Sequence, residues 1–316
     1  NAYNVAVGYA AGENVTTGVQ NTLVGGLAGD ALTQGARNTV LGYSALTDDT
    51  LGQYAVAIGY SALANQNFTT ATNNYNIAIG YNAAGNLTTG INNTIIGGLA
   101  GDALTTGSNN TFVGAGAATS GVITGNANVG IGTATLPALT SGANNCAMGE
   151  DSGPAVTSGS NNLLLGHDAG RTGSPGGNIT TESNNVVLGD ENIVAIYAQV
   201  QTISSSDERD KTDFKDLDLG LDFVKALEPV TYYWDKRSKY GDKSAEDYDL
   251  NAQTPDGTHK EDWMDIGFKA QAVVALEEAA GYKISDKTNL VSNLTEDGKQ
   301  YGLQYENFVP ILVKAI

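Results

Sequence analysis

The chain has very few cysteines, almost no basic residues in its first two thirds and no long apolar run. One of its 316 residues is cysteine, Cys146, so no disulfide within the chain can stabilise the fold. The first 200 residues contain no lysine and two arginines, and the formal net charge of the whole chain is −18. An acidic chain without basic stripes argues against nucleic acid as a partner. No apolar run approaches the roughly 20 residues that cross a bilayer, so we expect no membrane insertion.

The composition changes abruptly near residue 200. Residues 1–200 hold 33 of the 40 glycines, whereas residues 201–316 hold 14 of the 16 Lys+Arg and 23 of the 34 Asp+Glu. This change predicts a repeat shaft over 1–190, a connecting strand over 191–203 and a second domain over 204–316. Because the chain begins inside a repeat and stops within an apolar segment, we interpret it as a fragment that lacks a C-terminal tail.

The first part consists of eleven repeats, each with a short apolar core that ends in glycine. Seven of the ten intervals between these glycines are 17 residues long, and the others are 18, 21 and 23. An asparagine stands four residues before ten of the glycines, and Ala55 is the exception. Asparagine tolerates left-handed backbone and its amide can bond to a neighbouring turn. We therefore predict a structural ladder of asparagines along the stack that includes Asn21, Asn38, Asn76, Asn93 and Asn110.

Apolar residues flank the middle of each unit at a spacing of two, as Ile77 and Ile79 do, which predicts a short β-strand. The middle residue is also apolar or small, so such a strand needs cover on both faces. One face can pack inside its own coil, and identical chains can cover the other. We predict a mainly β fold, namely a trimeric parallel β-solenoid or β-roll shaft of ~17-residue repeats followed by a small α+β domain. The two longest units place insertions at 60–75 and 167–184, which we expect to project sideways.

The segments Asn4–Ala11 and Asn76–Ala83 resemble the β-roll repeats of trimeric autotransporter adhesin heads and repeats of phage tail fibres. The segment after the shaft has a second resemblance. Ser206-Asp207-Glu208-Arg209-Asp210-Lys211 resembles the opening of the intramolecular chaperone domain of endosialidase-type phage tailspikes. Further matching segments follow in the family's order, at 227–234, 266–271 and 304–316.

The second resemblance implies a domain that trimerises, guides folding of the preceding fibre and is released by autoproteolysis. Ser206 corresponds to the nucleophile and Lys211 to the general base, with cleavage at the Ser205–Ser206 bond. Without the resemblance, a serine five residues before a lysine is weak support for catalysis, and the serine run could equally cap a helix. Whether the chain is an enzyme, a serine–lysine peptidase acting only on itself, therefore stays open here.

Two functions are consistent with these features, and a third is disfavoured by them. The first is a structural phage tail-fibre protein, extracellular in the virion, whose shaft attaches to the host cell. Its partners would be a homotrimer of itself, other tail-fibre or baseplate proteins, and a host surface glycan or protein receptor. The alternative is a bacterial trimeric surface adhesin with a non-cleaving trimerisation domain. A depolymerase would need paired carboxylates facing a groove, and the first 200 residues hold only 11 scattered acidic residues.

No metal or cofactor is expected from the sequence. His167 and His259 are the only histidines, lie far apart in the chain and have no cluster of further ligands at typical zinc spacing. No segment has the glycine-punctuated spacing of an EF-hand.

Overall fold

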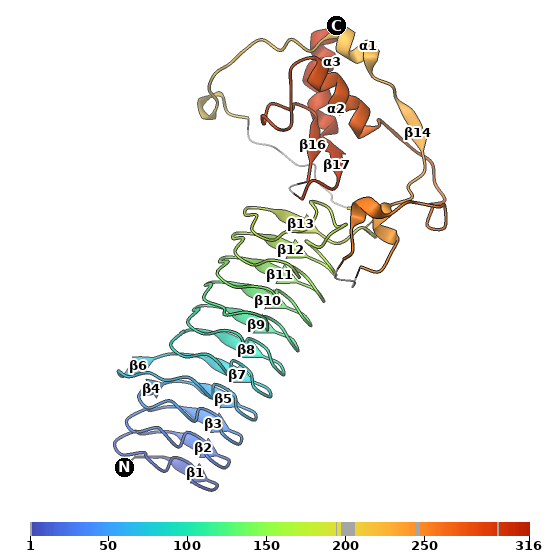
Figure 1. Ribbon diagram of the computed structural model, residues 1–316. Coiled ribbons are helices and arrows are strands. Elements are labelled where there is room, and N and C mark those ends of the chain that lie inside the picture. The colour runs from blue at the N-terminus through green and yellow to red at the C-terminus, as the bar shows by residue number, and fades with distance from the viewer. Residues whose placement is uncertain (1, 194, 197–205, 244–246, 296) are drawn as a thin grey trace. The chain divides into compact units, whose positions relative to one another are not determined.

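The computed structural model describes residues 2–193, 195–196, 206–243, 247–295 and 297–316 (Figure 1). The chain divides into two compact units, residues 1–190 and residues 191–316. Each unit is described by itself below.

The first unit is a parallel β-solenoid, which confirms the mainly β architecture predicted from the repeats. One three-residue strand from each repeat joins a single sheet of 11 parallel strands, and Figure 1 shows the coils stacked one on another. Equivalent residues of successive repeats are paired in register, for example Ala78 with Ile95 and Ile95 with Phe112. The strands, in sheet order, are β1 (Val5–Val7), β2 (Thr22–Val24), β3 (Thr39–Leu41), β5 (Val56–Ile58), β7 (Ile77–Ile79), β8 (Thr94–Ile96), β9 (Thr111–Val113), β10 (Val129–Ile131), β11 (Cys146–Met148), β12 (Leu163–Leu165) and β13 (Val186–Leu188).

The glycine after each strand is required by both conformation and space. Gly97 has a φ of +136°, a backbone conformation that side chains with a Cβ rarely adopt. A Cβ added there would lie 2.5 Å from the carbonyl oxygen of Gly114 in the next coil. The close stacking of the coils therefore selects glycine at this position in the repeats from Gly8 to Gly149.

Except in β1, the middle residue of each strand of the 11-stranded sheet is buried in the coil, and the two flanking residues point outward. Ile95 and Phe112 are fully buried at the middle position, whereas the flanking Leu41 is 49% exposed and Met148 is 40% exposed. The outward face thus keeps apolar side chains partly in water on a single chain. This is the arrangement expected when one strand face is covered by its own coil and the other is not.

The asparagines form a buried, hydrogen-bonded column along the solenoid. Asn93 Oδ1 accepts a hydrogen bond from the main-chain N of Asn110 at 2.9 Å, and Asn93 Nδ2 donates to the carbonyl of Gly107 at 3.0 Å. Asn38 is held in the same way, with its main-chain N donating to Asn21 Oδ1 at 3.0 Å. Each amide therefore links its own coil to its neighbours.

The column is interrupted at Ala55, and residues of the first insertion replace the missing amide. Asn74 Oδ1 accepts from the main-chain N of Asn76 at 2.9 Å, and Asn76 Nδ2 donates to Gln66 Oε1 at 2.8 Å. Gln66 Nε2 in turn donates to Asp49 Oδ2 at 2.7 Å. Asn74 thus supplies the acceptor for the buried main-chain N–H of Asn76, and Gln66 supplies one for the Asn76 side-chain amide.

The expectation that the two insertions project sideways is wrong. Phe68 in the first is only 6% exposed, and β6 (Thr72–Asn73) pairs in parallel with β4 (Gly52–Gln53) of the preceding coil. In the second, Ile179 is buried in the core of the shaft. Apolar side chains within the inserted residues draw both segments back onto the solenoid.

The second unit is small and mixes helices with two-stranded sheets. Its apolar core contains Phe223, Val273, Val291 and Phe308. β14 pairs antiparallel with β15, and β16 with β17. The elements are η1 (Glu208–Asp210), α1 (Leu221–Ala226), β14 (Val230–Tyr232), η2 (Arg237–Lys239), η3 (Leu250–Ala252), β15 (Asp265–Gly267), α2 (Ala270–Ala279), β16 (Ser292–Leu294), β17 (Tyr301–Leu303), η4 (Tyr305–Asn307) and α3 (Phe308–Ala315).

A buried carboxylate joins α2 to the start of β16. Glu277 is 1% exposed, and its Oε1 accepts from the backbone N of Leu290 at 2.6 Å and of Val291 at 2.8 Å. Its Oε2 accepts from the backbone N of Ser292 at 3.0 Å. Three consecutive N–H groups therefore share one carboxylate, which compensates for its burial.

The connecting strand expected over 191–203 falls largely outside the described residues. Residues 191–193 and 195–196 are described, and none of these five lies in a strand. None of the helices in the described part of the chain has the length and apolar composition that crossing a lipid bilayer requires.

Candidate functional site

A tight turn at the start of the second unit brings a serine and a lysine together. The main-chain N of Lys211 donates to the carbonyl of Glu208 at 3.1 Å, and Asp207 Oδ1 accepts from the main-chain N of Arg209 at 2.9 Å. The segment expected as a helix start is thus one 3-10 turn, η1, capped by Asp207 and not by the serine run. This turn reverses the chain so that residue 211 lies beside residue 206.

The two residues predicted as nucleophile and base lie within hydrogen-bond distance. Lys211 Nζ is 2.6 Å from Ser206 Oγ and 3.3 Å from the main-chain oxygen of Ser206. Both residues are exposed on the single chain. A serine hydroxyl becomes a nucleophile when a neighbouring base takes its proton, and a neutral amine at this distance can do so.

An ion pair between Asp207 and Arg209 stabilises the turn. Arg209 Nη2 lies 2.6 Å from Asp207 Oδ2, and Arg209 Nε lies 3.0 Å from Asp207 Oδ1. The hydrogen bonds from the Arg209 side chain, with help from its main-chain N–H, lower the pKa of Asp207 below its usual value. The carboxylate is therefore ionised over the neutral pH range and keeps the turn closed.

The other predicted site residues have different surroundings. Ser205, expected on the other side of the cleaved bond, lies outside the described residues. The five asparagines of the proposed ladder are buried and hydrogen-bonded to their neighbours, as described above. Such contacts leave their amides engaged with the chain itself.

An apolar groove of about 390 Å³ opens on the second unit. It is lined by residues of α1, α3 and the segments before β14 and after β15, with Phe268, Phe308 and Leu312 among them. Leu312 is 45% exposed, and Val313 on the same helix is 69% exposed. This unit therefore presents apolar side chains to solvent where a further protein surface could pack.

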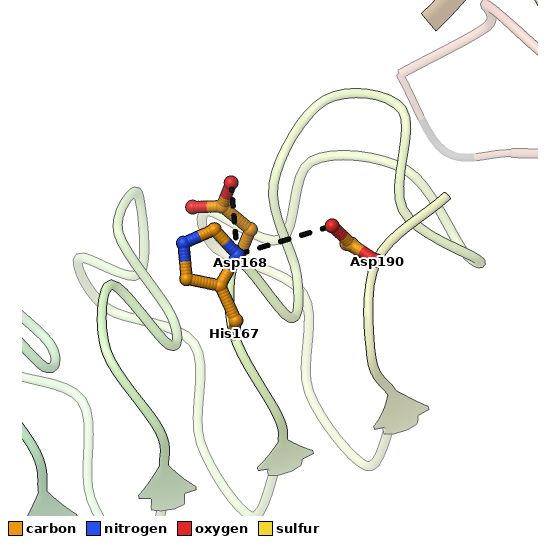
Figure 2. A group of neighbouring side chains, drawn as sticks. All are labelled: His167, Asp168 and Asp190. Atoms are coloured by element: carbon orange, nitrogen blue, oxygen red, sulfur yellow. Dashed lines mark ion pairs between the residues drawn. The ribbon is translucent and has the colours of Figure 1, made fainter. Parts of the chain in front are cut away.

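One cluster was missed by the sequence analysis. His167, Asp168 and Asp190 lie together at the end of the shaft (Figure 2), although His167 and Asp190 are 23 residues apart. The repeat itself predicts this contact. His167 follows Gly166 and Asp190 follows Gly189, so the two residues occupy the same position of successive units. Aligning all positions of the repeat, and not only the glycines and asparagines, would have predicted their contact.

Part of the second unit is similar to a known protein family. A family model described as "Chaperone of endosialidase" matches residues 206–282, so the match begins at Ser206. No curated protein and no solved structure matches the chain. The matched segment follows the parallel β-solenoid in the chain.

Proposed function

We propose that this chain is the shaft of a phage tail fibre joined to a C-terminal chaperone that drives trimerisation and folding and then cuts itself off next to Ser206. The observation that carries the proposal is the 2.6 Å distance between Lys211 Nζ and Ser206 Oγ, at the first residue of the chaperone match. This pair lies in the second unit, close in sequence to the change in composition near residue 200.

The proposed reaction is an attack by Ser206 Oγ on the carbonyl carbon of Ser205. Lys211 Nζ takes the hydroxyl proton and then delivers it to the leaving amide nitrogen of Ser206. The product is an ester between the Ser205 carbonyl and Ser206 Oγ. Water hydrolyses this ester, leaving a carboxylate on Ser205 and restoring the Ser206 hydroxyl on a chain that now begins with a free amine.

Trimer formation is supported by the apolar surfaces that one chain leaves in water. The outward strand positions of the shaft include Leu41, Ile96 and Met148, each at least 37% exposed. The exposed apolar residues of α3 and the groove beside it give the second unit a similar surface. Burying apolar area contributes roughly 25 cal/mol per Å², so side-by-side copies of the chain would stabilise both units.

Trimerisation of the second unit would also help the shaft to fold. Three chaperone segments that associate first raise the effective concentration of three shafts and align their repeats. The coils can then form outward from that end, although pairing between distant strands is otherwise slow. Cleavage removes the segment that nucleates folding from the finished fibre. The fibre then persists because it unfolds very slowly.

The proposed location is the virion, outside the host cell. The trimeric shaft would join other tail-fibre or baseplate proteins and would contact a glycan or protein receptor on the host surface.

The experiment compares wild type with Ser206→Ala and Lys211→Gln by denaturing electrophoresis and intact-mass measurement. We expect two fragments, with the second beginning at Ser206, in wild type only. Ser204→Ala is the matched control, because it removes a neighbouring serine of the same run, and it should still be cut. A single unbroken chain in wild type would refute autoproteolysis, and if that chain were trimeric it would favour a non-cleaving bacterial adhesin.

A further inference from the structure

The last two coils of the shaft bring three potential metal ligands to one place. Strand β12 pairs in parallel with β13, with Leu165 opposite Leu188. Two residues further along each chain segment, His167 and Asp190 therefore lie on adjacent coils, which are separated by the ordinary strand spacing of about 4.8 Å. Asp168 follows His167 directly, in a left-handed conformation with a φ of +58°.

The distances between the side chains are close to those of a coordination site. His167 Nδ1 lies 3.5 Å from Asp168 Oδ2 and 3.9 Å from Asp190 Oδ2 (Figure 2). One ligand atom from each of the three residues lies within 4.8 Å of the others. Metal–ligand bonds of about 2.1 Å in a tetrahedral site place neighbouring ligand atoms about 3.4 Å apart. Small rotations of the side chains would therefore bring the three atoms around one ion.

The Asp168 carboxylate gives a second, independent indication of a ligand. Asp168 is only 5% exposed, and its Oδ1 is buried without a hydrogen-bond partner. Its Oδ2 is paired with Arg171 Nη1 at 2.5 Å. A buried acceptor that lacks a donor is unfavourable, and native structures contain few such atoms. A cation bound through Oδ1, while Oδ2 stays on Arg171, would remove that cost.

The charges around the cluster also favour a cation. Two carboxylates face one imidazole, and Arg171 is paired with Asp168. His167 is itself exposed, with 59% of its side chain accessible, so an ion there could complete its coordination with water.

We propose that His167 Nδ1 and the carboxylates of Asp168 and Asp190 bind one divalent transition-metal ion of the zinc class. One imidazole nitrogen with two carboxylate oxygens is a donor set that suits zinc better than calcium or magnesium, which prefer oxygen ligands alone. The ion would join the two ends of the longest unit, because His167 and Asp168 begin its insertion and Asp190 follows the strand after it. It would thereby hold the last coil of the shaft in place.

The test uses the full chain without a purification tag, stripped with EDTA and titrated with zinc chloride. We expect calorimetry to detect one ion per chain and the thermal midpoint of the shaft to rise until the site is saturated. His167→Ala and Asp190→Asn should lose both effects. His167 is largely exposed, so its replacement leaves the packed core unchanged and a loss of binding cannot be attributed to misfolding.

His259→Ala and Cys146→Ser are the matched controls, since they remove the other histidine and the single thiol. Both variants should bind zinc as wild type does. The proposal is overturned if the wild-type chain shows no saturable binding, or if His167→Ala binds zinc with unchanged affinity.

Discussion

Replacing one asparagine of the ladder by alanine is the sharpest test of what holds the coils together. Asn93 is fully buried in the middle of the shaft. Its Oδ1 is the acceptor for the main-chain N–H of Asn110, and its Nδ2 is a donor to the carbonyl of Gly107. Asn93→Ala leaves both of these buried backbone groups without a partner.

The expected loss follows from those two groups. A buried polar group left unpaired costs about 1–3 kcal/mol, so Asn93→Ala should reduce the free energy of unfolding by roughly 2–6 kcal/mol. The chain already contains alanine at the equivalent position of another repeat, Ala55. There Asn74 accepts from the main-chain N–H of Asn76, and Gln66 accepts from the Asn76 side-chain amide.

Guanidinium denaturation in a Ser206→Ala background, which keeps both units on one chain, measures the effect. Far-ultraviolet circular dichroism follows the shaft, whereas tryptophan fluorescence follows only the second unit, because Trp234 and Trp263 are the only tryptophans. The circular dichroism midpoint should fall and the fluorescence midpoint should stay unchanged. Asn86→Ala is the control, since Asn86 is exposed and also donates to a backbone carbonyl of the next coil. Its expected effect is within about 0.5 kcal/mol. Equal losses in the two variants would refute the argument that buried amides stabilise the stack.

Three further predictions concern single carboxylates. Glu277→Ala leaves three consecutive backbone N–H groups without their acceptor. It should lower the free energy of unfolding of the second unit by about 3 kcal/mol or more, measured by tryptophan-detected denaturation. Glu278 is exposed, so Glu278→Ala should have little effect. Burial raises the pKa of Asp49 above its ordinary value of 3.8, so its contribution to stability is full below pH 3.8 and is lost as the pH rises through the folded-state pKa. Asp49→Asn cannot ionise, and its stability relative to wild type should therefore increase across that window in denaturation midpoints taken from pH 3 to 7; a constant difference would contradict this assignment. Asp207→Ala removes the cap of the turn and the contact with Arg209. Self-cleavage should therefore slow by about 10- to 100-fold in a gel time course. An unchanged rate would show that the turn closes without the Asp207 carboxylate.

The sequence by itself determined the solenoid and the position of the candidate dyad. Glycine recurring at nearly constant intervals requires the same turn in every repeat, because only glycine fits against the next coil, as Gly97 does against Gly114. The short spacing from Ser206 to Lys211 allows a single turn to bring the two side chains together. Both features depend on residues close in the chain or on a strict period, and such local constraints can be read without coordinates.

Only the tertiary structure decided how residues from different coils meet. The sequence predicted that the insertions project, whereas Phe68 and Ile179 are buried because their apolar side chains find space in the core. The replacement of the missing asparagine at Ala55 by Asn74 and Gln66 could not be predicted, since it depends on where an irregular segment folds back. The cluster of His167, Asp168 and Asp190 arises for the same reason: stacking of coils sets contacts between residues far apart in the sequence, and the geometry of the stack fixes which of them lie within bonding distance.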